Sequence, residues 1–293
     1  MRTSLKPEMY LAIVRVALMA ALTSTNLSAA PATLDVEPTH WFTQFQHDLR
    51  AAWVRPDVSM HGNVKFVSQN DVWQPGRHFK DGKSWLALAC TSQGCALEPA
   101  TLSVKNEMKK DLSDDKATAG QHLQFSLVVP SKAKTIAWFD TSVAPTWLRP
   151  GSVTAYFSGI GHPKETGKGT LEALIGLPSG ETATLVPLLL KDTSQDESDP
   201  FWFLQLRAQN KRQLLLGMLD MCSGSVNSED YLLWAGDLDG DGKPDYLISF
   251  VDTDGPVHLY LSSAATPKQL VGLAGVYNIP PDEVACEGAR AKN

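Results

Sequence analysis

Short apolar runs separated by Gly, Pro, Asn and Asp fill most of this sequence from about Gly62 onward, a pattern typical of β-strands joined by tight turns. We expect strands at 63–67, 85–90, 97–104, 123–129, 135–139, 153–157, 171–177, 182–190, 201–206, 213–221, 231–234, 246–251 and 257–261. Strands do not alternate regularly with helices, and there is no dinucleotide-binding fingerprint, so antiparallel packing is favoured. The expected fold class is mainly β, with antiparallel strands and hairpins in a sandwich or an incomplete propeller, although leucine-rich runs such as 171–177 could instead be helical.

Two segments depart from this pattern. Thr39 is a suitable N-cap for a single N-terminal amphipathic helix. The apolar residues that follow it at helical spacing are Trp41, Phe42, Phe45, Leu49 and Trp53. The segment 105–120 mixes charges of both signs between two expected strands, and we expect it to be a solvated loop.

A chain of 293 residues is long enough for one large domain or two small ones. The Pro- and Gly-containing stretch 144–151 is the best candidate for a boundary. It divides the chain into an N-terminal region, 31–150, with the helix and the first strands, and a second β-rich region, 151–293.

Residues 1–30 have the layout of a secretory signal peptide: a basic leader with Arg2, Lys6 and Arg15, the short apolar run 16–22, and a segment of small polar residues. Ser28-Ala29-Ala30 fits the cleavage pattern, and a cut after Ala29 or after Ala32 fits as well. The apolar run is far shorter than the roughly 20 residues that span a bilayer. We therefore expect a periplasmic or secreted protein without stable membrane insertion after cleavage; the alternative is a short anchor that stays attached.

The charge of the chain indicates which partners to expect. Its 26 basic and 32 acidic residues give a net charge of −6, and removal of the leader makes the chain more acidic. Nucleic-acid binding needs clustered Lys and Arg, so the sequence argues against a nucleic-acid partner.

The four cysteines are informative because exported proteins meet an oxidising environment, in which an even number of cysteines indicates disulfides. We expect one bond between Cys90 and Cys95, across a tight hairpin, and a second between Cys222 and Cys286. A zinc site is the competing interpretation, but a lone Cys-x4-Cys spacing is a poor match to zinc motifs.

The stretch WAGDLDGDGKPDYLISF, residues 234–250, places four aspartates within nine residues, between two apolar runs. Carboxylates this close repel one another, and a cation would relieve the repulsion. Calcium takes six to eight oxygen ligands in a flexible geometry, whereas magnesium prefers a rigid octahedron with several waters. We expect a Ca2+ site whose ligands are the carboxylates of Asp237, Asp239, Asp241 and Asp245 and the backbone carbonyl of Lys243.

This loop is not an ordinary EF-hand, because Ile248 stands where the bidentate Glu belongs. The pattern Asp-x-Asp-Gly-Asp-Gly-x-x-Asp instead resembles the calcium loop of FG-GAP and VCBS repeats, best known from integrin-like β-propellers. The resemblance implies the ligand roles given above and a loop that joins two adjacent strands. It covers about twenty residues and occurs once, so it does not imply a propeller; we expect the ion to stabilise the fold, with a ligand-bridging ion as the alternative.

We find no catalytic motif in the sequence. There is no Gly-x-Ser-x-Gly elbow and no His-Glu-x-x-His helix, so no catalytic residue is assigned. We expect a noncatalytic binding protein that recognises another protein or an envelope polymer. The alternatives are a periplasmic hydrolase of cell-wall or carbohydrate substrates, and an inhibitor or immunity-type protein that binds an envelope enzyme.

Overall fold

The computed structural model describes residues 64–76, 78–82, 84–110, 117–142, 145–158, 172–190, 201–219, 228–250, 256–267 and 269–278. Three predictions lie outside the described residues: the signal peptide at 1–30, the amphipathic helix that begins near Thr39, and the disulfide between Cys222 and Cys286.

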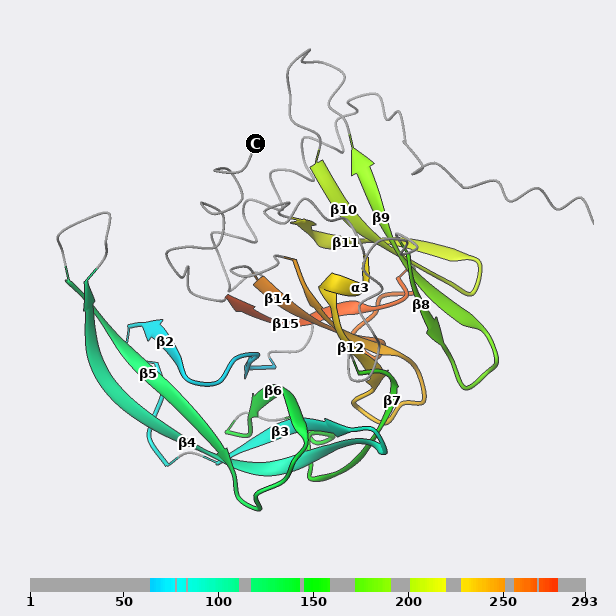
Figure 1. The fold of residues 1–293 in the computed structure, drawn as a ribbon. Coiled ribbons are helices and arrows are strands. Elements are labelled where there is room, and N and C mark those ends of the chain that lie inside the picture. The colour runs from blue at the N-terminus through cyan, green and yellow to red at the C-terminus, as the bar shows by residue number, and fades with distance from the viewer. Residues whose placement is uncertain are drawn as a thin grey trace, which may run out of the picture. The chain divides into compact units, whose positions relative to one another are not determined.

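Most described residues belong to two antiparallel sheets (Figure 1). The large sheet has eleven strands: β1 (Phe66–Val67), β2 (Val72–Pro75), β3 (Ser84–Thr91), β4 (Gly94–Lys110), β5 (Ala117–Leu127), β6 (Lys134–Asp140), β7 (Gly151–Phe157), β12 (Leu232–Asp237), β13 (Asp245–Ser249), β14 (Pro256–Leu261) and β15 (Gly272–Asn278). Their order is β1-β6-β3-β4-β7-β12-β13-β14-β15, and β5 pairs with both β4 and β2. The mainly β, antiparallel fold class is therefore confirmed, and strands from both sides of residue 150 share one sheet.

The large sheet curves until it nearly closes on itself like a barrel. Its two end strands, β1 and β15, come together, and the amide of Val64 donates a hydrogen bond of 3.0 Å to the carbonyl of Ala274. Inside the curve lies an aromatic-rich core. There the ring of Phe125 stacks on Trp138 with centroids 4.9 Å apart, and the ring of Trp85 meets Phe125 edge-on at 5.0 Å.

The second sheet has four strands in the order β11-β10-β9-β8. Their bounds are β8 (Ala173–Gly176), β9 (Thr182–Leu190), β10 (Phe201–Ala208) and β11 (Lys211–Leu219). Alternate residues of this sheet, such as Ile175 and Leu204, belong to a second apolar core. The residues of β12–β14 that face away from the first core, such as Tyr246 and Ile248, belong to it as well. A short helix, α3 (Ser228–Tyr231), leads into β12. The strands β12–β14 therefore have a packed core on each face.

Tight turns join neighbouring strands, as the sequence predicts. The turn between β10 and β11 is Gln209-Asn210, both with positive φ (50° and 59°), the conformation of the two-residue turns that suit hairpins. Cys90 and Cys95 face each other across the β3–β4 hairpin and form the predicted disulfide.

Two strands were not predicted, and each has a weak local pattern. The strand β2 is short and ends in Pro75, which suits an edge strand because proline cannot donate to a ladder. The strand β15 contains Gly272 and Gly275, which dilute its alternation of apolar residues.

The prediction of a solvated loop over 105–120 is wrong. Residues 105–110 continue β4, and residues 117–120 begin β5, so the two strands form one long hairpin (Figure 1). Their pairing extends without a break from Ala100 with Leu127 to Lys110 with Ala117. Charged residues are compatible with these strands because their side chains reach solvent or a partner. Lys105 pairs with Glu107 at 2.5 Å, and the ammonium group of Lys109 lies 5.7 Å from the ring centre of Trp73.

Three side-chain amides bond to backbone where strand pairing is missing. Asn70 accepts from the amide of Phe125 (2.6 Å) and donates to its carbonyl (3.0 Å). Gln121 does the same with both backbone groups of Phe79, at 2.9 and 3.1 Å. Gln213 bonds to the backbone just before β15. These amides satisfy backbone groups that a neighbouring strand would otherwise pair.

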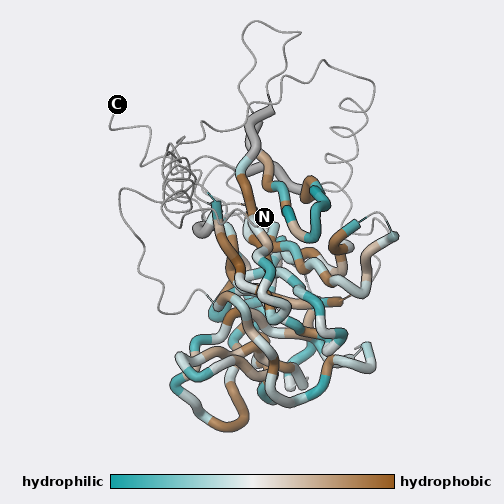
Figure 2. The backbone as a smooth tube through the Cα atoms, turned by 90° about the vertical axis from the view of Figure 1, so that its right-hand side faces the viewer, coloured by the Kyte–Doolittle hydropathy of each residue, from teal (hydrophilic) through white to brown (hydrophobic). Residues whose placement is uncertain are grey.

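Apolar and polar residues are interleaved along the described strands, as Figure 2 shows. Among the described residues, no helix is long and apolar enough to cross a bilayer.

A substitution at Gly120 would test the contact between β2 and the long hairpin of β4 and β5. A Cβ atom there would lie 2.4 Å from two ring carbons of Trp73 and 2.5 Å from the carbonyl oxygen of Gln74. Gly120→Ala should therefore lower the free energy of unfolding by about 1–3 kcal/mol, measured by urea denaturation, because β2 must move. The control is Gly176→Ala in β8, where a Cβ meets nothing within 4 Å. Equal stability of the two variants would contradict this account of the contact.

Candidate metal centre

The acidic loop, residues 237–245, joins β12 to β13, which are neighbours in the large sheet. Gly236 pairs with Asp245 at the base of the hairpin, and Leu238 is buried in the first core. Strand pairing therefore holds the two ends of the loop together, and the buried leucine anchors its beginning.

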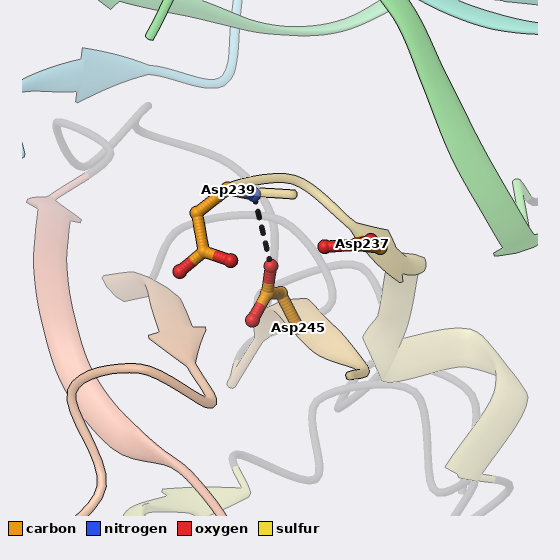
Figure 3. A group of neighbouring side chains, drawn as sticks. All are labelled: Asp237, Asp239 and Asp245. Carbon is orange, nitrogen blue, oxygen red and sulfur yellow. Dashed lines mark hydrogen bonds between the residues drawn. The ribbon is translucent and has the colours of Figure 1, made fainter. Parts of the chain in front are cut away.

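Three of the loop carboxylates converge (Figure 3). Asp237, Asp239 and Asp245 each contribute one oxygen to a group whose atoms lie within 4.8 Å of one another. Asp237 and Asp239 are partly exposed, whereas Asp245 is fully buried. The triad could hold a metal ion, and its donors are all hard oxygens of the kind that bind calcium and magnesium.

Backbone amides of the loop itself hold the carboxylates in place. Asp237 accepts hydrogen bonds from the amide of Gly240 through Oδ1 (2.8 Å) and from that of Gly242 through Oδ2 (3.0 Å). Both glycines have positive φ, 78° and 80°, which a residue with a side chain rarely adopts. The Asp-x-x-Gly-x-Gly spacing thus coils the loop around its first carboxylate.

A second turn, which follows β14, completes the surroundings of the acidic loop. The amide of Ser262 donates to Oδ1 of Asp245 at 2.8 Å, and the hydroxyl of Ser262 donates to Oδ2 of Asp241 at 2.8 Å. The hydroxyl of Ser263 hydrogen-bonds to Asp239. Sequence reasoning missed both serines, because nothing in a Ser-Ser pair seventeen residues beyond Asp245 indicates that it returns to the loop.

The structure places the predicted ligands in two groups. Asp237, Asp239 and Asp245 converge, whereas Asp241 is held by Ser262 and by the amide of Lys243, which donates to its Oδ1 at 2.8 Å. The side chain of Lys243 is exposed, and its ammonium group lies 3.9 Å from Oδ2 of Asp241. A ligand role for Asp241 and for the Lys243 carbonyl stays a prediction.

Burial controls the protonation of the centre. The pKa of Asp245 is raised to about 8, mainly by burial; the charge of Asp239 acts in the same direction, and backbone hydrogen bonds from Ser262, Leu238 and Asp239 act against it. Burial also raises the pKa of Asp239. The protein alone therefore favours a proton on Asp245 at neutral pH, and a cation would compete with that proton.

Comparisons of the chain with models of known protein families, with curated proteins and with solved structures find no match.

The buried carboxyl of Asp245 predicts a pH dependence in the presence of chelator. Between pH 4 and pH 8 the unfolded chain has lost this proton while the folded chain keeps it, so stability should fall as pH rises, by at most about 1.4 kcal/mol per pH unit. Urea denaturation across this range measures the slope, and Asp245→Asn should flatten it. A wild-type slope that Asp245→Asn leaves unchanged would show that another group causes the dependence.

Proposed function

We propose that this chain is an exported calcium-binding protein that recognises another protein or an envelope polymer without catalysing a reaction. In this proposal Ca2+ binds the acidic loop and stabilises the fold. The observation that carries it is the convergence of Asp237, Asp239 and Asp245, one of them fully buried, on a loop between adjacent strands.

Charge and ligand type support a cation at this loop. Three carboxylates within 4.8 Å of one another repel when ionised, and a divalent cation turns that repulsion into attraction. We favour calcium over magnesium because the loop resembles the FG-GAP and VCBS calcium loop and coils tightly enough to supply several oxygens from few residues. The proposed resemblance is confined to the loop, because the described strands form one eleven-stranded sheet and one four-stranded sheet, not a ring of repeated four-stranded blades.

A structural role for the ion follows from what holds Asp245. Its carboxylate accepts from the amides of Leu238 and Ser262, which belong to two different turns of the large sheet. An ion on the same carboxylate would tie these turns together at the end of β12–β14. This is the basis for proposing that calcium stabilises the fold.

Two features support export and a binding role. The disulfide between Cys90 and Cys95 suits an oxidising compartment, in agreement with the secretory leader at 1–30. The acidic charge disfavours nucleic acid and leaves a protein or an envelope polymer as the proposed partner. The calcium loops that this one resembles occur in adhesion proteins, which also favours binding over catalysis.

Calcium should raise the melting temperature of the wild-type protein and leave Asp239→Asn unchanged. At a hundred times its dissociation constant, calcium would add about 2.7 kcal/mol to the free energy of unfolding. Thermal denaturation in calcium, in magnesium and in chelator measures this. The control is Asp71→Asn, an exposed aspartate near His122, which should keep the calcium response. Equal melting of the wild-type protein in calcium and in chelator rejects the calcium assignment.

The binding role is tested by immobilising the mature protein and exposing it to envelope extract from its own source, in calcium and in chelator. We expect a protein or polymer to be retained in stoichiometric amount. Asp239→Asn, compared with Asp71→Asn, shows whether retention depends on the calcium loop. If nothing is retained under either condition, the binding proposal fails.

A further inference from the structure

The connection between β14 and β15 contacts two parts of the protein that are far apart in sequence. At its start, Ser262 and Ser263 bond to the carboxylates of Asp241, Asp239 and Asp245. These bonds bring together segments separated by 17 to 24 residues. The position of the connection therefore depends on the conformation of the acidic loop.

At its other end, the connection is held by the four-stranded sheet. Gln213 of β11 donates to the carbonyl of Val271 at 2.7 Å, and its Oε1 accepts from the amides of Leu270 (2.6 Å) and Val271 (3.0 Å). The side chain of Val271 is buried in the second core, which the small sheet shares. The side-chain amide of Gln213 thus makes the backbone hydrogen bonds that a neighbouring strand would otherwise make here.

The described residues of the connection, 262–267 and 269–271, are held by contacts among themselves and with the start of β15. The amide of Ala265 donates to Ser262, and the amide of Gln269 donates to Thr266, at 3.1 and 2.9 Å. The backbone of Ala264 lies so close to Gly272 that a Cβ atom there would be 2.0 Å from the Ala264 carbonyl oxygen. A turn bonded to itself and packed against the start of β15 cannot easily absorb a displacement at one end.

We propose that the β14–β15 connection couples the acidic loop to the four-stranded sheet, so that a change in one alters the stability of the other. The coupling needs no ion, because its contacts are all hydrogen bonds and packing within the chain. The coupling goes beyond the proposed calcium role, because the acidic loop would then affect the stability of the four-stranded sheet, to which the loop does not belong.

Hydrogen exchange on the full chain in chelator tests the coupling. The amides of Leu270 and Val271 report on the contact with Gln213. Ser262→Ala combined with Ser263→Ala should speed exchange at both amides about five-fold or more, the lower end of typical coupling between sites. The control is Ser131→Ala, which removes a local serine contact in the β5–β6 turn and should leave these amides unchanged.

The reverse change follows from reciprocity, because coupling free energy is the same in both directions. Gln213→Met should speed exchange at the amide of Ser262, which donates to Asp245. Gln121→Met removes the same kind of backbone contact, at Phe79, and should not affect Ser262. If each variant speeds exchange only at its own contact and leaves the other end unchanged, the coupling is rejected.

Adding calcium extends the test, and this arm alone rests on the proposed function. Millimolar calcium should slow exchange at Leu270 and Val271 in the wild-type protein and have a smaller effect in the double serine variant. If calcium changes nothing while the variants still show the two-way effect, the calcium assignment fails and the coupling stands. If calcium slows exchange at the acidic loop alone, and the variants act only locally, calcium binds and the coupling fails.

Discussion

The buried carboxylate of Asp245 is the interaction on which the arrangement of β12–β15 depends. It accepts hydrogen bonds from Leu238 in the turn that begins the acidic loop and from Ser262 in the turn that follows β14. A buried carboxylate is tolerated only when its oxygens are satisfied or its charge is compensated. The hydrogen bonds satisfy the oxygens in part. They do not compensate the charge, as the raised pKa of Asp245 indicates. The site therefore favours either a proton or a cation, and this competition links the chemistry of the loop to the stability of the sheet.

Side-chain amides have a related part elsewhere in the fold. Three side chains bond to backbone groups of a segment with which their own backbone forms no strand pair: Asn70, Gln121 and Gln213. Backbone groups that lack a partner are costly once they are buried. The amides supply donors and acceptors at these points, so the large sheet can turn toward closure and the small sheet can pack against it.

These features agree with a protein whose conspicuous chemistry is structural. The carboxylates of the acidic loop face one another and the second turn, and the disulfide between Cys90 and Cys95 secures a hairpin. The proposed calcium role and the proposed coupling are consistent because both begin at Asp245 and Ser262. They differ in what they explain, since the ion would set the stability of the loop and the connection would carry that stability to β11.

The antiparallel β class, most strand positions, the β3–β4 disulfide and the three converging aspartates could be predicted from the sequence, because each depends on residues that are close together in the chain. Three features became visible in the three-dimensional structure alone: Ser262 and Ser263 return to the loop, β15 lies beside β1, and residues 105–110 extend a strand. Gly272 is an example. It weakens the local strand pattern, yet it lies where the backbone of Ala264 leaves no room for a side chain. Periodicity and turn residues are local signals, whereas strand order, close approach and contacts between loops depend on which distant segments pair.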